Sequence, residues 1–315
     1  MPHDFDLLVI GDANPDVVLG PAPDPIEYGQ REVLVSTGAI VLGGSGAITA
    51  CGAARLGLRV AFAGRVGRDH AGGMVYDILT SLGVVCFLRI DDEVGTPLTT
   101  VLTRGDDRAI LTAAGTLART TADDVRPELL ATSRHVHASS YFLMPELALT
   151  LPKLFREARR HGATTSLDTN DDPSGRWDRS GVDAVLAESD ILLPNAAEAM
   201  KLSGCATPHE AAAALADGRR IVAVKNGADG ALCHDGAELI ECPTIAVSTV
   251  DAVGAGDSFN AGFIAGMLLD MPPRRRLALA VACGALSTRA TGGTAAQPSL
   301  VEALDHLPSY ETDQT

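Results

Sequence analysis

The feature that most constrains this chain is the regular alternation of short apolar runs with longer, helix-like segments. DLLVIG (6–11) and RVAFAGRVG (59–67) are typical of buried strands because each is apolar, short and closed by glycine. The segments 47–57 and 72–83 are typical of helices, and each ends at a glycine stop. Strands joined by helices form a mostly parallel sheet covered on both faces. We therefore predict an α/β fold, a doubly wound three-layer α/β/α sandwich.

Two β-rich insertions do not fit that alternation. They cover about residues 16–42 and 84–114, and neither contains a helix of useful length. Prolines at 21, 23 and 25 forbid a helix in the first insertion, where VLVS (33–36) is predicted as a strand. We expect the two segments to form one small sheet that lies over the site as a lid. The whole chain, 1–315, is then a single domain.

The bulk composition restricts the partners and the compartment. The chain carries a formal net charge of −15, which disfavours nucleic acid and anionic membranes as partners. Its first apolar run is short and flanked by acids, and no run approaches the roughly 18–20 apolar residues of a membrane span. None of the six cysteines stands in a C-x-x-C pair, so they indicate a reducing compartment. We expect a cytoplasmic protein.

Several common sites are disfavoured by the sequence. No lysine follows a glycine, so there is no Walker A loop. GGSGAIT (43–49) lacks the third glycine of a dinucleotide fingerprint, and it only approaches the G-x-S-x-G of hydrolases, which makes Ser45 a poor nucleophile. His135 and His137 lie two apart on one strand without an evident third ligand, so they are interpreted as structural histidines.

The stretch DAVGAGDSFNAGF (251–263) has two interpretations. Asp257 is a helix N-cap that follows a flexible glycine turn, or it is a general base. In the second case the backbone N–H groups of 254–257 stabilise the charge that grows on a transferred phosphoryl group, and Asp257 accepts the proton of the attacking hydroxyl.

Three other polar clusters also have two interpretations each. N-x-x-E at 195–198 is either a capping box or a site where Asn195 and Glu198 hold Mg²⁺ through waters. NPD (14–16) and DTNDD (168–172) follow strand ends, where ligands of open α/β sheets gather, and they suit a polyhydroxylated ligand. The alternative for both is ordinary turn chemistry.

Taken together, these motifs resemble the ribokinase-like, or PfkB, family of carbohydrate kinases. DAVGAGDSFNAGF is similar to the family's C-terminal signature, and GGSGAITACGAARLG with VGRDHAGGMV is similar to its N-terminal signature. N-x-x-E and K-N-G-A-D-G (225–230) fall in the family's order. The resemblance covers nearly the whole chain and implies an ATP-dependent kinase that phosphorylates a hydroxyl of a sugar or sugar-like small molecule. The segment DTNDDPSGRW favours a hexose or a sugar acid.

The resemblance also implies roles for individual residues. Asp257 is the base, and the anion hole is formed by Gly254, Ala255 and Gly256. The substrate-facing residues are Asn14, Asp16, Gly43, Gly44, Arg108, Asp168 and Asn170. The ATP-binding residues are Asn195, Lys225, Gly227 and Gly230. Glu198 serves Mg²⁺ through water, Asp251 lies near a monovalent cation such as K⁺, and the lid implies a homodimer.

The chain departs from the family pattern at three positions. Ile48 stands where the family usually has a substrate-contacting Asn, Ala252 replaces a Thr, and Lys225 replaces a Thr. None of these removes the base or the anion hole, so we expect an active enzyme. Two alternatives stay open: a nucleoside kinase of the same fold, and a sugar-binding regulator that has lost turnover.

Overall fold

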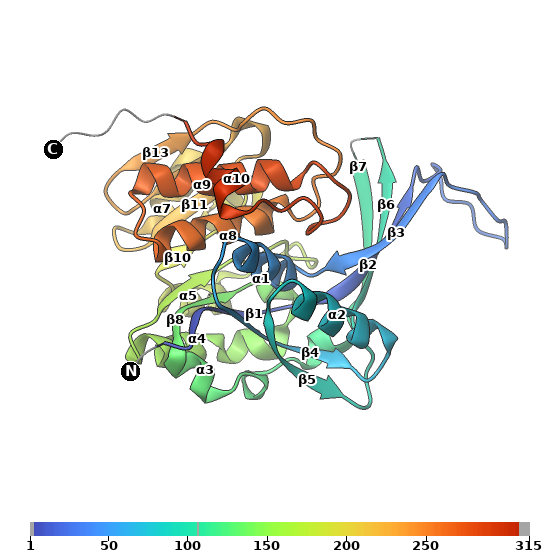
Figure 1. The fold of residues 1–315 in the computed structure, drawn as a ribbon, viewed down its shortest axis with the longest axis horizontal. Coiled ribbons are helices and arrows are strands. Elements are labelled where there is room, and N and C mark those ends of the chain that lie inside the picture. Colours follow the sequence, from blue (N-terminus) through green and yellow to red (C-terminus); the bar gives the residue numbers. More distant parts are fainter. Residues whose placement is uncertain (1–2, 106, 309–315) are drawn as a thin grey trace.

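The fold is built on one large sheet that supports two layers of helices (Figure 1). The computed structural model describes residues 3–105 and 107–308. In spatial order the strands of the large sheet are β13 (Leu239–Cys242), β12 (Ala231–His234), β11 (Ile221–Lys225), β10 (Ile191–Leu192), β9 (Thr164–Leu167), β8 (Ser133–Ala138), β1 (Phe5–Ile10), β4 (Val60–Gly67) and β5 (Val85–Asp91). The strands from β11 to β5 pair in parallel, and β12 and β13 add an antiparallel hairpin at one edge.

Helices cover both faces because alternate side chains of each strand point to opposite sides. Leu7 and Val9 enter one core, whereas Leu8 and Ile10 enter the other. The first face packs against α1 (Ser45–Arg55), α2 (His70–Ser81), α8 (Ala255–Leu268), α9 (Pro273–Ser287) and α10 (Leu300–Asp305). The second packs against α3 (Pro127–Thr132), α4 (Pro145–Arg160), α5 (Arg179–Leu186), α6 (Ala196–Ser203) and α7 (Pro208–Ala216). This is the predicted three-layer sandwich.

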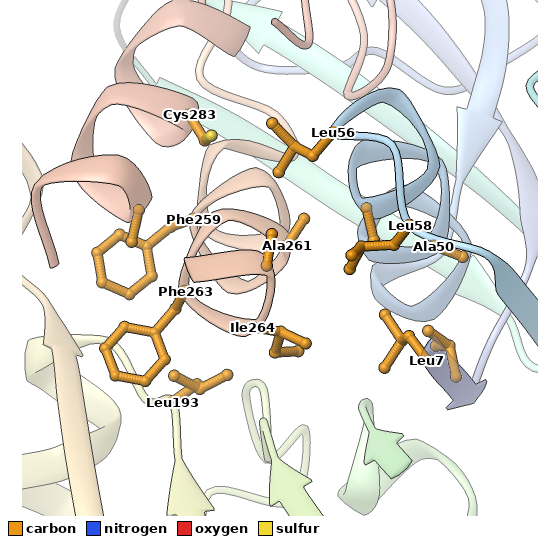
Figure 2. Packing of buried hydrophobic residues seen from close by; sticks show 14 of the residues in the cluster. Leu7, Ala50, Leu56, Leu58, Leu193, Phe259, Ala261, Phe263, Ile264 and Cys283 are labelled. Carbon is orange, nitrogen blue, oxygen red and sulfur yellow. The ribbon is translucent and has the colours of Figure 1, made fainter. Parts of the chain in front are cut away.

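Helix α8 lies in the middle of the first layer, where it contacts both α1 and α9. Figure 2 shows its Phe263 and Ile264 above the sheet, with Leu193 and Leu7 below them. Single 3₁₀ turns complete the described elements: η1 (Gly115–Arg119), η2 (Ala122–Asp124), η3 (Tyr141–Leu143) and η4 (Gly227–Asp229). A tightly packed α8 fixes the position of its own N-terminus, which matters for the site below.

A second, four-stranded sheet stands to one side of the sandwich (Figure 1). In spatial order its strands are β3 (Thr37–Gly43), β2 (Asn14–Gly20), β6 (Leu98–Arg104) and β7 (Asp107–Ala113). Strands β2 and β6 pair in parallel, and the two outer pairs are antiparallel. The small sheet is therefore built from two chain segments that are far apart in the sequence.

The assignment of residues 84–91 to the lid was wrong. Val85–Asp91 form β5, which pairs in parallel with β4 from Ala61↔Val85 to Gly67↔Asp91. Cys86 and Leu88 pack against the core beneath α2. The segment belongs to a strand–helix–strand unit with β4 and α2, so only the part of the second insertion after it enters the small sheet.

The predicted strand VLVS (33–36) was also wrong, because β3 begins one residue later at Thr37. The ladder between β2 and β3 ends at the pair Gly20↔Thr37. Pro21 follows on the β2 side, and proline has no N–H to extend the ladder. The segment 33–36 therefore has no strand to pair with.

Free thiols occur at Cys51, Cys86, Cys205, Cys233 and Cys283. Within residues 3–105 and 107–308, no helix combines the length and the apolar character needed to cross a bilayer.

Candidate functional site

The N-terminus of α8 tests the interpretation of Asp257 as an N-cap. The helix cap is Gly254, which has φ +74° and makes no side-chain cap hydrogen bond. Asp257 lies inside the first turn, so the interpretation of Asp257 as an N-cap is wrong. A Cβ at Gly254 would lie 2.5 Å from Cα of Gly293, so both the backbone conformation and the space require glycine here.

The first turn of α8 presents free backbone donors. Ser258 N–H bonds Gly254 O at 2.9 Å, and Ala255 N–H bonds Ala252 O at 3.3 Å. No acceptor within the described residues meets the N–H groups of Gly256 and Asp257. Because these donors stand at the positive end of the helix dipole, they form a site for an anion.

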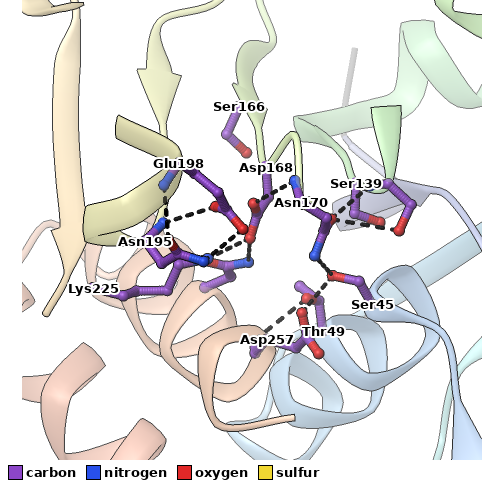
Figure 3. Close-up of polar contacts among 12 residues, drawn as sticks. Ser45, Thr49, Ser139, Ser166, Asp168, Asn170, Asn195, Glu198, Lys225 and Asp257 are labelled. Carbon is purple, nitrogen blue, oxygen red and sulfur yellow. Dashed lines mark hydrogen bonds and ion pairs between the residues drawn. The ribbon is translucent and has the colours of Figure 1, made fainter. Parts of the chain in front are cut away.

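The Asp257 carboxylate lies beside those donors and faces α1 (Figure 3). Its Oδ1 accepts a hydrogen bond from Ser45 Oγ, and its backbone oxygen accepts one from Thr49 at 3.4 Å. Burial raises the pKa of Asp257 to about 7, although the Ser45 hydroxyl acts in the opposite direction. A carboxyl with a pKa near neutrality is suited to accept a proton from a hydroxyl.

A cavity of about 470 Å³ adjoins the same turn. Gly256, Lys225, Gly227 and Gly230 all line it, so three residues predicted for the nucleotide stand on one wall. The rest of the lining is largely apolar, and it includes Phe259 of α8. A largely apolar slot that ends at free helix N–H groups suits a nucleotide, with its base in the slot and its phosphates at the helix.

Asn195 and Glu198 form the predicted capping box at the start of α6. Asn195 Oδ1 accepts from Glu198 N at 2.9 Å, and the Glu198 carboxylate accepts from Asn195 N at 2.8 Å and from Asn195 Nδ2 at 2.6 Å. Burial and the negative charge of Asp168 raise the pKa of Glu198 to about 7. The capping interpretation is confirmed. The Glu198 carboxylate still has lone pairs that can accept hydrogen bonds from waters.

Asp168 and Lys225, predicted for different ligands, form one buried ion pair. Lys225 Nζ lies 2.5 Å from Asp168 Oδ2, and Asp168 has no exposed surface. Asn260 of α8 joins them: its Nδ2 donates to Asp168 Oδ2 at 2.6 Å. Sequence reasoning missed Asn260, although its position three residues after Asp257 places it on the same face of the helix.

Asn170 occupies a left-handed conformation, with φ +53°. Its Oδ1 accepts from the backbone N–H of Ser140 at 2.7 Å, and its Nδ2 donates to Ser45 Oγ at 3.1 Å (Figure 3). Ser45 therefore connects Asn170 with Asp257. From the sequence, Ser45 was interpreted only as a poor nucleophile, so this position was not predicted.

Asn14 and Asp16 lie at the base of the small sheet on β2. Asn14 Nδ2 donates to Asp16 Oδ1 at 2.7 Å and to Thr99 Oγ1 at 3.2 Å. Burial raises the pKa of Asp16 to about 6. A Cβ at Gly43 would lie only 2.0 Å from Asp16 Oδ1, so the carboxylate requires glycine in that place. The predicted pair Asp16 and Gly43 is thus brought into contact.

Asp12 is a further residue that sequence reasoning missed. It follows β1, and its carboxylate accepts the N–H groups of Ser45 at 3.1 Å and Gly46 at 2.9 Å. It therefore caps α1 from a distant part of the chain, beside Gly44, whose φ is +89°. The absence of a capping side chain in the glycine run before α1 was the signal that could have found it.

Arg108 and Asp251 do not join the residues around Asp257. They line a second cavity of about 610 Å³ between the small sheet and the loop 249–252. The Asp251 carboxylate accepts backbone N–H groups of Val253 and Gly292, each at 2.9 Å. Thr249 and Ala252 line both cavities, so the second cavity adjoins the first.

His135 and His137 are buried beneath the site and are hydrogen-bonded to hydroxyls. His135 contacts Thr164 Oγ1 and Ser166 Oγ, and His137 contacts Ser166 Oγ, all at 2.7 Å. Burial lowers the pKa of both rings, to about 3 and about 4, so both are neutral. No cluster of three ligating side chains able to hold a metal ion occurs in the described ranges.

The comparison with protein families accounts for this arrangement. The model of the pfkB family carbohydrate kinases matches residues 4–300. The chain belongs to this family. It is a carbohydrate kinase, a phosphotransferase that acts on a hydroxyl group.

Individual pfkB relatives support the assignment. An ATP-dependent ribose-1-phosphate kinase of Halopiger xanaduensis is 33% identical over 256 residues, which cover 81% of this chain and 82% of the relative. A 2-dehydro-3-deoxygluconokinase of Bacillus subtilis is 30% identical over 306 residues, 91% and 92% of the two chains. The crystal structure of adenosine kinase from Sinorhizobium meliloti shows a similar fold, with a TM-score of 0.86 and 24% identity over 96% of this chain and 98% of that one.

The departure of this pfkB chain at Ile48 has a packing explanation. Ile48 is 3% exposed, and its side chain lies against Gly254 and Gly293. A Cβ at either glycine would lie within 3.1 Å of an Ile48 carbon. The isoleucine therefore packs against the turn that begins α8.

Proposed function

We propose that the protein transfers the γ-phosphoryl group of ATP to a hydroxyl of a sugar that carries an acidic group. The observation that carries the proposal is the Asp257 carboxylate, with a pKa of about 7, beside the two free N–H groups that start α8. The donor assignment is supported by the adjoining cavity with Lys225, Gly227 and Gly230, and by the name of the ATP-dependent relative.

The proposed reaction is one in-line displacement. The acceptor hydroxyl gives its proton to Asp257, and its oxygen forms a bond to the γ-phosphorus. The bond from that phosphorus to the β–γ bridging oxygen breaks, and ADP leaves with the electron pair. The N–H groups of Gly256 and Asp257 stabilise the charge on the transferred group. The anion hole predicted from Gly254, Ala255 and Gly256 enters this proposal through the Gly256 N–H and through Gly254 as the turn before it. The Ala255 N–H does not take part, because it already bonds Ala252 O.

The proposed cations are Mg²⁺ and K⁺. Glu198 supplies one buried carboxylate, which fits a Mg²⁺ that keeps most of its waters and is held chiefly by phosphates. When bound, Mg²⁺ neutralises charge on the phosphate oxygens. Asp251 has no ion-pair partner among residues 3–105 and 107–308, which fits a K⁺ beside it.

An acidic acceptor is supported by Arg108. Its guanidinium has no ion-pair or hydrogen-bond partner in the described parts of the chain, and it lines the cavity under the small sheet. The names of the two relatives specify a sugar phosphate and a sugar acid as their substrates. A free arginine recognises either group through paired N–H donors.

A panel of acceptors tests the proposal through ADP release from Mg·ATP. We expect turnover with sugar phosphates or sugar acids, and little with neutral sugars or nucleosides. Arg108→Ala should raise KM for the acidic acceptor about 10- to 100-fold, because a charge-assisted hydrogen bond contributes about 1.5–3 kcal/mol.

Arg104→Ala is the matched control, because Arg104 lies on the same sheet but is paired with Asp24. It should leave KM unchanged. Efficient turnover of a neutral sugar, with no effect of Arg108→Ala, would exclude the acidic acceptor. Turnover confined to nucleosides would identify a nucleoside kinase instead.

We also propose a cytoplasmic homodimer that associates through the small sheet. Ile40 and Leu111 are 64% and 58% exposed, and the strand register places them on the same face of the small sheet, which suits an apolar interface. Sedimentation velocity should give the mass of a dimer, and Leu111→Lys should give that of a monomer of 32.6 kDa. A monomeric wild-type protein would contradict this part of the proposal. A reducing compartment is supported by the free thiols of Cys51, Cys86, Cys205, Cys233 and Cys283.

A further inference from the structure

We propose that Ser45 is a positioning residue that holds Oδ1 of Asp257, so that Oδ2 alone receives the proton of the acceptor hydroxyl. This inference rests on the proposed function, because it gives Asp257 the role of the base. It concerns a side chain that the nucleotide cavity does not include and that belongs to a different helix, α1.

The direction of the hydrogen bonds carries the inference. The backbone N–H of Ser140 can only donate, so the Asn170 oxygen that lies 2.7 Å from it must be Oδ1. The Asn170 amide nitrogen therefore points to Ser45 Oγ, at 3.1 Å, and donates to it. Ser45 Oγ has one proton of its own, and that proton is left for Asp257 Oδ1.

The position of Ser45 is fixed on both sides. Its backbone N–H donates to Asp12 Oδ2 at 3.1 Å, which fastens the first turn of α1. Asn170 is held in its left-handed conformation by Ser140 and by its own N–H, which donates to Asp168 at 3.1 Å. The hydroxyl is thus presented to Asp257 by rigid elements from two separate parts of the chain (Figure 3).

The arrangement has two consequences for the base. Oδ1 is engaged, and no donor in the described part of the chain meets Oδ2, so Oδ2 is the atom open to an acceptor hydroxyl. A hydrogen bond to the ionised carboxylate also stabilises the basic form, which keeps the pKa of Asp257 from rising further with burial.

The pH dependence of kcat/KM tests the inference. Ser45→Ala removes the hydroxyl but keeps the N–H that donates to Asp12. The acid limb is the part of the profile where activity falls because Asp257 becomes protonated. It should move to higher pH by about one unit or more, because a hydrogen bond to a charged group contributes about 1.5–3 kcal/mol and one pKa unit corresponds to about 1.4 kcal/mol. Ser45→Thr restores a hydroxyl and should restore the limb. A purely structural role would lower activity at every pH without moving the limb.

A second measurement does not need turnover. Carbon-13 NMR of protein labelled at aspartate carboxyls follows the ionisation of Asp257 directly, and Asp257→Asn identifies its signal. The midpoint should rise in Ser45→Ala and return in Ser45→Thr. The same midpoint in all three proteins would overturn the inference. Absent turnover with a shifted midpoint would instead refute the proposed function, and only the hydrogen bond from Ser45 to Asp257 would then stand.

Discussion

Replacing Asp257 by asparagine should reduce kcat by about 10²–10⁴-fold, because general-base catalysis contributes an effect of that size. Asparagine keeps the shape of the side chain, and its Oδ1 can still accept from Ser45. Affinity for ATP, measured by calorimetry, should therefore be retained. Loss of ATP binding together with kcat would contradict a pure proton-transfer role.

The same variant has an expected effect on stability. Burial raises the pKa of Asp257 from 3.8 to about 7, so the wild-type protein loses stability as pH rises from about 4 to 7. Asp257→Asn does not ionise and should escape that loss. In urea unfolding it should be more stable than the wild type at pH 8 and similar to it below pH 4.

Asp69→Asn is the matched control. Asp69 is a true N-cap: its carboxylate accepts from Gly72 N at 2.8 Å at the start of α2, and it also accepts from Thr96 N. Asparagine can still cap the helix through Oδ1, but its Nδ2 cannot accept from Thr96 N, so the replacement should lower stability by about 1 kcal/mol and leave kcat unchanged. If Asp69→Asn reduced kcat as strongly as Asp257→Asn, the loss at Asp257 would have to be attributed to folding.

The sequence predicted the sandwich because its signals are local. Apolar runs, glycine stops and helix periodicity each depend on neighbouring residues, and together they determine most elements of both layers. The errors occurred where the structure of a segment depends on which distant strand it pairs with. Residues 84–91 are equally suited to either sheet, and only pairing with β4 assigns them to the large one. Helix α10 was not predicted, because it is short, lies in the polar C-terminal segment and has Ala303 as its one buried residue.

Most individual residues of the site were predicted from the sequence, but the contacts between them were not. Asp257, Asn195 and Asp168 each follow recognisable turn or strand-end patterns. Ser45 and Asp257 are separated by 212 residues and Asp168 and Lys225 by 57, so no local pattern links either pair. Those contacts are set by the packing of α8 against α1 and against the sheet. The helix spacing from Asp257 and the uncapped glycine run before α1 point to Asn260 and Asp12. Both were still missed, because their partners Asp168 and Ser45 lie far away in the sequence.

Lys225→Met should be the most destabilising of these substitutions. The change removes the cation from a buried pair in which Lys225 is 13% exposed and Asp168 is not exposed at all. The free energy of unfolding should fall by about 3–5 kcal/mol, because Asp168 is left as a buried carboxylate without its cation. Urea unfolding measures this. Lys201→Met, which removes a lysine lying over the Trp177 ring, should change stability by less than about 1 kcal/mol.

A double variant separates the two roles that Lys225 has in this site. Adding Asp168→Asn to Lys225→Met removes the unpaired charge, so about 1–3 kcal/mol of the lost stability should return as coupling between the two sites. The lysine also lines the cavity proposed for the nucleotide, and the second change does not replace its positive charge. KM for ATP should therefore stay raised in the double variant even as the fold recovers. Recovery of both the free energy of unfolding and KM for ATP would show that Lys225 acts only through Asp168. The positive charge of Lys225 would then have no separate part in binding the nucleotide.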